Sequence, residues 1–201
     1  IGYNALTALT TGSWNTAVGH EAGKAMTTGA DNTAIGLSAG AAITTGTRNI
    51  AIGGVALDNA DAENDNLAIG YAALGGAING GEKNVAIGNY SLDALTSGDN
   101  NTGVGYGALT SNTTGSQNSA YGQESLYTNT TGTGNTASGY YSLYYNTDGN
   151  YNTASGYTSL RSNTTGRDNT TAGYGSLRSN TVGSYNTAIG AEALYDANRT
   201  A

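Results

Sequence analysis

A seventeen-residue period runs through the whole chain and restricts its fold more than any other feature. Asparagine opens eleven copies at intervals of seventeen residues, except for one interval of eighteen, whose extra residue lies between Leu74 and Gly81. Positions are numbered here from this asparagine, along the consensus N-T-A-I-G-Y-x-A/S-L-x-x-N-T-T-G-x-x. The asparagines are Asn15, Asn32, Asn49, Asn66, Asn84, Asn101, Asn118, Asn135, Asn152, Asn169 and Asn186.

The repeat is too short for helices. Helical repeats need about 33 residues or more, and here glycine occupies position 5 in all twelve copies and position 15 in most, where it would weaken a helix. We therefore predict an all-β fold, a parallel β-solenoid (β-roll or β-helix) of about twelve coils. Residues 1–201 form a single repeat array, with the longer coil near 66–83, which we interpret as a segment of a longer fibre protein.

Each coil is expected to contain two strands of four or five residues, N-T-A-I-G and Y-x-S-L, separated by turns such as N-T-T-G. In-register stacking would place the asparagines in a structural ladder of amide hydrogen bonds. Glycine at position 5 would adopt a positive φ or allow close backbone approach. Threonine hydroxyls of the T-T-G turn would bond the local backbone.

Two pairs of adjacent small or apolar positions predict an apolar outer surface. Alanine precedes isoleucine or valine at positions 3 and 4, and alanine or serine precedes leucine at positions 8 and 9. Because adjacent side chains of a strand face opposite ways, one member of each pair should face outward. Monomers seldom expose such a stripe, so we expect identical chains to associate laterally with closed symmetry. The candidate interface at position 4 is Ile1, Val18, Ile35, Ile52, Ile69, Ile87, Val104 and Ile189.

Composition excludes several other functions. The net charge is −7, and the seven lysines and arginines are scattered, which argues against nucleic-acid binding. No apolar run approaches the roughly 20 residues that span a bilayer, so we expect no direct membrane insertion of this segment. The absence of cysteine excludes disulfides and thiolate metal sites.

The segments Asn32–Gly36, Asn66–Leu74 and Asn186–Leu194 resemble the head repeats of YadA-like trimeric autotransporter adhesins. They are also similar to the NTAxGxxAL repeats of trimeric bacteriophage tail fibres. The resemblance implies a left-handed solenoid and a homotrimer, located outside the cell, on a bacterial surface or a virion tail. It further implies a stiff stalk or adhesive head whose partner is a host-cell surface glycan or protein.

Aromatic residues supply the candidate ligand contacts. Six tyrosines share position 6 and should form a stacking ladder, whereas Tyr144, Tyr145 and Tyr151 lie nearer the turns and are the weak ligand candidates. We expect Trp14 to have a packing role and His20, the single histidine, to lie on the surface. The six tyrosines are Tyr3, Tyr71, Tyr106, Tyr140, Tyr157 and Tyr174.

Catalytic and metal chemistry find little support in the sequence. Asp58–Asp65 contains four carboxylates, but their spacing matches no calcium loop, so we interpret the segment as a solvated turn without a metal ion. No nucleophile–base pair or phosphate loop emerges, so we expect neither a cofactor nor enzyme activity.

The alternative function is ice binding by a threonine-rich solenoid. It would use the threonine row at position 14, which is interrupted by Ala62, Gly80, Ser97, Asp148 and Val182. The row consists of Thr11, Thr28, Thr45, Thr114, Thr131 and Thr165.

Overall fold

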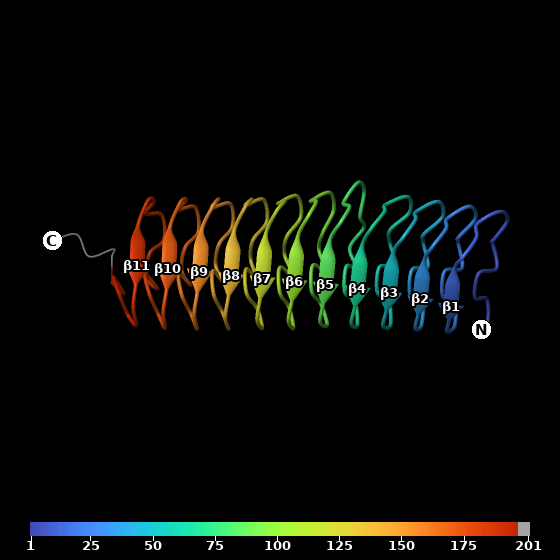
Figure 1. The fold of residues 1–201 in the computed structure, drawn as a ribbon, viewed down its shortest axis with the longest axis horizontal. Helices are drawn as coiled ribbons and strands as arrows, with labels where there is room; N and C mark the ends of the chain where they lie inside the picture. The colour runs from blue at the N-terminus through green and yellow to red at the C-terminus, as the bar shows by residue number, and fades with distance from the viewer. Residues whose placement is uncertain (197–201) are drawn as a thin grey trace.

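The computed structural model describes residues 1–196, which form a rod of coils stacked in sequence order, with β1 near one end and β11 near the other (Figure 1). Within these residues there is no helix, and eleven strands form one parallel sheet in which each strand pairs with its neighbours in sequence. This confirms the predicted parallel β-solenoid. The strands are β1 (Thr16–Val18), β2 (Thr33–Ile35), β3 (Ile50–Ile52), β4 (Leu67–Ile69), β5 (Val85–Ile87), β6 (Thr102–Val104), β7 (Ser119–Tyr121), β8 (Thr136–Ser138), β9 (Thr153–Ser155), β10 (Thr170–Ala172) and β11 (Thr187–Ile189).

Each of the eleven coils from Asn15 on contains one strand of three residues, at positions 2 to 4, so the prediction of two longer strands is wrong. The Y-x-S-L segment turns instead, because its residues at positions 7 and 9 adopt left-handed backbone. In the coil of β8 these residues are Tyr141, with φ of 56°, and Leu143, with φ of 50°. A left-handed residue on each side of Ser142 is incompatible with an extended strand.

Small side chains fill the interior. In β8, Ala137 is fully buried between the exposed Thr136 and Ser138, which confirms that positions 3 and 4 face opposite ways. The prediction that one of positions 8 and 9 faces outward is wrong, because Ser142 and Leu143 are both fully buried. The left-handed turns around them break the two-residue alternation that the prediction assumed.

The glycine column at position 5 permits the close stacking of coils. Gly53 has a φ of 136°, a conformation that L-residues rarely adopt, and an added Cβ would lie 2.3 Å from the carbonyl oxygen of Gly70 in the next coil. Glycine is therefore required here by both its φ and the approach of the neighbouring backbone. Position 15 is tight in the same way, since a Cβ on Gly98 would lie 2.1 Å from the carbonyl oxygen of Gly115.

Asparagine side chains join neighbouring coils from Asn15 to Asn186. The Oδ1 atom of Asn118 accepts hydrogen bonds from the backbone N–H of Asn135, at 2.9 Å, and from the Asn135 side chain, at 3.2 Å. The Nδ2 atom of Asn118 donates to the carbonyl oxygen of Gly132 at 2.8 Å. The same backbone-to-side-chain bond links all eleven asparagines from Asn15 to Asn186, at 2.9 to 3.1 Å. This set is the asparagine ladder.

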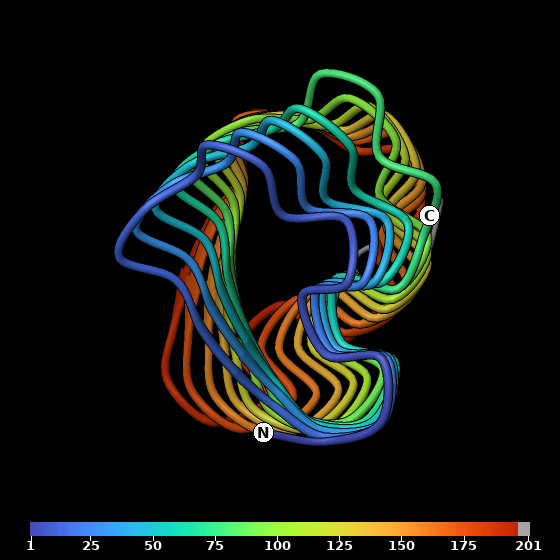
Figure 2. The ribbon, with the colours of Figure 1, turned by 90° about the vertical axis from the view of Figure 1, so that its right-hand side faces the viewer.

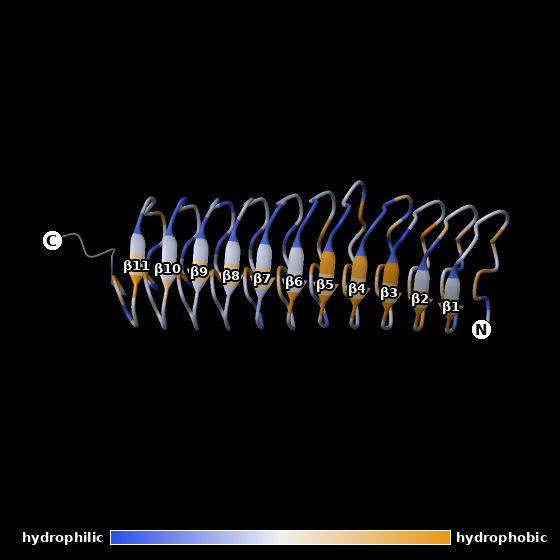
Figure 3. Ribbon diagram, in the orientation of Figure 1, coloured by the Kyte–Doolittle hydropathy of each residue, from blue (hydrophilic) through white to orange (hydrophobic). Residues whose placement is uncertain are grey.

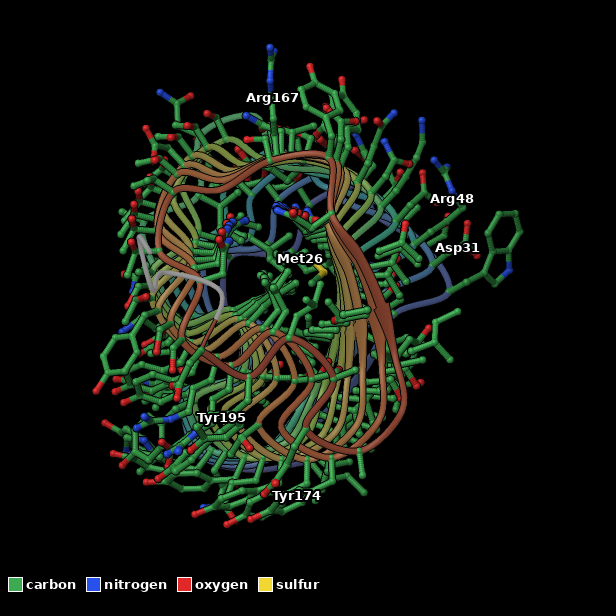
Figure 4. All side chains as sticks on the ribbon, turned by 90° about the vertical axis from the view of Figure 1, so that its left-hand side faces the viewer. Met26, Asp31, Arg48, Arg167, Tyr174 and Tyr195 are labelled. Carbon is green, nitrogen blue, oxygen red and sulfur yellow. The ribbon has the colours of Figure 1, made fainter. Side chains whose placement is uncertain are left out.

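A second ladder exists in the C-terminal half, at position 12. In the N-terminal half this position is apolar, and the labelled Met26 side chain points into the interior (Figure 4). From Asn112 to Asn180 it is asparagine, and each Nδ2 donates to the glycine carbonyl three residues later. From Asn129 on, each Nδ2 also donates to the preceding Oδ1, at 2.7 to 3.0 Å. The core therefore changes from apolar packing to amide hydrogen bonds along the rod. The members of the second ladder are Asn112, Asn129, Asn146, Asn163 and Asn180.

Threonine at position 13 also bonds between coils. The Thr113 hydroxyl donates to the carbonyl oxygen of Thr130 at 3.0 Å, and the Thr130 hydroxyl donates to that of Thr147 at 3.1 Å. The expected bond to the local backbone is therefore wrong at this position. The hydroxyl acts as another link between stacked turns.

The eighteen-residue coil accommodates a glutamate in a glycine column. Glu63 replaces glycine at position 15, and its Oε2 atom accepts the backbone N–H groups of Asp61 and Ala62 at 2.8 and 3.1 Å. Its Oε1 atom accepts the N–H of Gly80, in the longer coil, at 2.9 Å. Viewed along the rod, this coil bulges outward beyond its neighbours, whose outlines rotate progressively (Figure 2). The extra residue thus leaves room for the Glu63 side chain, while β4 and β5 stay in register.

Neighbouring glycines 53 and 54 provide a matched test of the stacking constraint. Gly53→Ala should lower the free energy of unfolding by about 3 kcal/mol or more, because Cβ would meet a backbone carbonyl that cannot move alone. Gly54→Ala should change it by less than about 1 kcal/mol, since its Cβ would only touch the Tyr71 ring at 3.4 Å. Urea denaturation followed by circular dichroism measures both, and equal losses would contradict the stacking geometry.

Candidate functional site

The outward face of the sheet is formed by the side chains at positions 2 and 4 of β1–β11, and is called here the sheet face. On β3, β4 and β5 both positions are apolar, which gives a contiguous patch on three neighbouring strands (Figure 3). On β8 and β9 both positions are threonine or serine. The sheet face is therefore apolar on β3–β5 and rich in hydroxyl groups on β8 and β9. The apolar patch consists of Ile50, Ile52, Leu67, Ile69, Val85 and Ile87.

The candidate interface residues all lie on this face or at its ends. Val18 and Ile35 are exposed on β1 and β2, and Val104 is half-buried on β6. Ile1 is 93% exposed, and Ile189 on β11 is similarly open. Sequence reasoning missed the contribution of position 2, whose usual threonine becomes Ile50, Leu67 and Val85 in the three central coils.

The tyrosine column at position 6 is continuous only near the C-terminal end. The rings of Tyr140 and Tyr157 stack at 5.2 Å, and those of Tyr157 and Tyr174 at 5.5 Å. Elsewhere the predicted ladder is wrong: Tyr71 and Tyr106 each meet the edge of Tyr90, which lies at position 7 between them. The cause is Asn89, which occupies position 6 of the intervening coil. At the other end Tyr3 stacks on His20 at 5.3 Å.

Two of the three weak ligand candidates come together in an aromatic cluster. Tyr144 packs edgewise against Tyr141 at 4.8 Å and against Tyr145 at 4.7 Å. The Arg161 guanidinium lies over all three rings, 5.0 to 5.7 Å from their centroids. Tyr151 is not part of this cluster, because position 17 lies on another side of the coil, where its ring covers Gly134.

The cluster also raises the pKa values of its phenols. Hydrogen bonding to Tyr140 is the largest effect on Tyr141, whose pKa is raised well above its ordinary value, with a further contribution from Glu124. Burial is the main reason for the raised pKa of Tyr144. Both side chains are therefore neutral hydrogen-bonding groups at any physiological pH.

Trp14 and His20 are both surface residues. The indole of Trp14 is 81% exposed, so the expected packing role within the chain is wrong. Trp14 occupies position 17, where the backbone turns outward with a φ of 57° and carries the ring away from the interior. His20 is exposed as predicted.

The acidic segment Asp58–Asp65 does not form a metal cage. Asp65 pairs with Arg48 at 2.6 Å, Asp61 accepts the Thr44 hydroxyl, and Glu63 is directed at backbone N–H groups. Among residues 1–196 no group of three or more histidine, aspartate or glutamate side chains could hold a metal ion. Asp61, Glu63 and Asp65 are therefore engaged by protein groups of this region and are not arranged around a shared cation site.

The threonine row of the ice-binding alternative lies on the outer surface. All six threonines of the row are exposed, as are Ala62, Ser97 and Asp148, which interrupt it. Gly80 and Val182 are exposed as well, so all five interruptions of the row face the solvent. Ice binding stays an untested prediction.

Comparisons with protein-family models, with curated proteins and with solved structures find no match. The resemblance to adhesin heads and tail fibres therefore stays a prediction. In the described part of the chain no helix is long and apolar enough to cross a membrane.

Two partly buried carboxylates lie at position 10 on either side of the longer coil. Burial raises the pKa of Asp58, with a smaller contribution from the charge of Asp93, and burial alone raises the pKa of Asp93. A carboxyl whose pKa is higher in the folded chain binds more protons when folded. Stability therefore falls as pH rises from about 4 through the raised pKa.

We expect Asp58→Asn to increase the free energy of unfolding at pH 7, where the cost of the buried charge is fully present. The increase should shrink as the pH is lowered and disappear below about pH 4, where the unfolded carboxyl also becomes protonated. Urea denaturation of the variant and the unmodified chain between pH 3 and pH 8 measures the difference. Asp148→Asn, which removes an exposed charge, is the control; an equal pH profile for both variants would contradict the assignment.

Proposed function

We propose that this chain is a structural segment of a surface fibre in which three identical chains associate through the sheet face. The apolar patch on β3–β5 is the observation that carries the proposal. Its six large side chains, Ile50 exposed and the other five half-buried, lie on the outward side of three adjacent strands, whereas soluble monomers rarely expose contiguous apolar patches. A role outside the cell as a stiff stalk or adhesive head is part of the proposal and follows the resemblance of the repeats.

The geometry of the rod favours association through faces over association through edges. Every strand between β2 and β10 already pairs on both sides, so strand addition along the rod is blocked. The sheet face, in contrast, runs along the rod and is the same on every copy. Cyclic symmetry about an axis roughly parallel to the rod would let each chain bury this face against its neighbours.

The role proposed is mechanical and adhesive rather than catalytic. Hydrogen bonds of the asparagine ladder cross the coil boundaries from Asn15 to Asn186, which makes the rod resistant to bending and to local opening. A stiff rod of this kind keeps its two ends at a fixed distance from each other. That property suits a segment that holds a binding surface away from a cell or virion.

The oligomeric mass tests this proposal. Static light scattering of the purified segment should give about three times the 20.1 kDa chain mass. Ile69→Asp should dissociate or aggregate the assembly, because it places a charge in the centre of the apolar patch, where an unpaired buried charge costs several kcal/mol.

Thr114→Asp is the control, since Thr114 is exposed at position 14, outside the sheet face. It should leave the mass unchanged. A monomeric parent chain would overturn the trimer, and equal effects of the two variants would remove the apolar patch from the interface.

A further inference from the structure

A missing side chain creates a pocket on the surface of the rod. Position 7 holds Tyr90 in one coil and Glu124 two coils later, but Gly107 in the coil between them. Gly107 is buried at the bottom of the resulting depression, and a Cβ there would touch Glu124, Thr110 and Tyr127 at 3.3 to 3.4 Å. The pocket has a volume of about 280 Å³ and opens to the solvent; its lining is Tyr90, Asp93, Tyr106, Gly107, Thr110 and Tyr127.

The aromatic walls of this pocket are held by other rings. Tyr106 meets Tyr90 at 80° with centroids 5.9 Å apart, and Tyr90 meets Tyr71 in the same edgewise manner. On the opposite side Tyr127 lies parallel to Tyr144 at 5.2 Å. The tyrosines thus come from three successive coils and are positioned before any ligand arrives, which lowers the entropic cost of binding.

The pocket is negatively charged. Asp93 is part of its lining and is partly buried, and burial raises the pKa of this carboxyl. Two further acidic residues are nearby: Asp58 interacts with the charge of Asp93, and Glu124 lies beside Gly107. Asp93 forms no salt bridge with any lysine or arginine of residues 1–196. A cation is therefore the ligand charge that this site lacks.

We propose that the pocket lined by Tyr90, Asp93, Tyr106 and Tyr127 binds an alkylammonium group. Tyrosine rings attract an ammonium through their negative faces, and the carboxylate supplies the opposite charge. A quaternary or primary ammonium is small enough for the pocket, and its alkyl substituents would contact the ring carbons. An anion would be repelled by Asp93. A neutral sugar would gain nothing from the uncompensated charge.

The site is independent of the proposed trimer, because all of its lining residues belong to one chain and lie at positions 6, 7 and 10, beyond the strand. Ammonium groups that an exposed fibre could meet include choline headgroups, lysine side chains and amino sugars. All three present the same chemistry to the pocket. Binding of each should be compared with that of tetramethylammonium, the simplest probe.

The test is a titration of the full chain with tetramethylammonium, followed by the NMR signals of the Gly107 and Thr110 amides. We expect saturable binding that Asp93→Asn weakens about tenfold or more, because the opposite charge is lost. Tyr106→Leu should weaken it roughly three- to tenfold, since it removes one aromatic wall. The matched controls, Asp148→Asn and Tyr174→Leu, should retain the parent affinity; Tyr174 has the same repeat position and a similar exposure, 55% against 51%.

Gly107→Asn fills the pocket without changing its charge. Asparagine tolerates the φ of 63° at this position, where other coils carry non-glycine residues such as Glu124, so the variant should fold. It should abolish binding while leaving the circular dichroism spectrum unchanged. Choline, Nα-acetyl-lysine N-methylamide with its free ε-ammonium, and glucosamine, titrated in parallel, identify the preferred source of the ammonium.

Two results would overturn the proposal. One is the absence of saturable tetramethylammonium binding by the folded parent chain. The other is equal binding of methyl glucoside, a neutral sugar, together with unchanged affinity in Asp93→Asn, which would make the pocket a neutral sugar site.

Discussion

The asparagine ladder is the interaction on which the stacking of coils depends. Each buried amide accepts the backbone N–H of the next asparagine and donates to a glycine carbonyl, so it satisfies polar groups that water cannot reach. Because this pairing recurs at every boundary, a coil that slipped by one residue would lose both bonds. Glycine at position 5 then allows the backbones to approach closely enough for these bonds to form.

On this common frame the two halves of the rod differ. Near β3–β5 the outer sheet face is apolar and position 12 is filled by side chains such as Ile43 and Leu95. Beyond β6 the face carries hydroxyl groups, position 12 becomes the second ladder, and tyrosines cluster around Arg161. The proposed subunit contact uses repeat positions 2 and 4, and the proposed ammonium pocket uses positions 6, 7 and 10. One repeat can carry both because its outward positions are free to vary.

The period, the glycine columns and the inward alanine could be predicted from the sequence, since each reflects one repeated physical requirement. The single strand per coil could not be predicted, because tyrosine and leucine rarely adopt the left-handed backbone that Tyr141 and Leu143 have. For the same reason the burial of both Ser142 and Leu143 was missed. The pocket exists because position 7 is glycine at Gly107, whereas the coils on either side have Tyr90 and Glu124 at this position. A consensus sequence averages over such differences between coils.

The stability of Asn118→Ala tests the role of the ladder most directly. The substitution leaves the fully buried N–H of Asn135 without its acceptor, and we expect the free energy of unfolding to fall by about 2–3 kcal/mol. Asn79→Ala, at an exposed position of the longer coil, is the control and should change it by less than about 0.5 kcal/mol. Equal, small effects of the two substitutions would contradict the account, because the coils would then be held in register by other contacts.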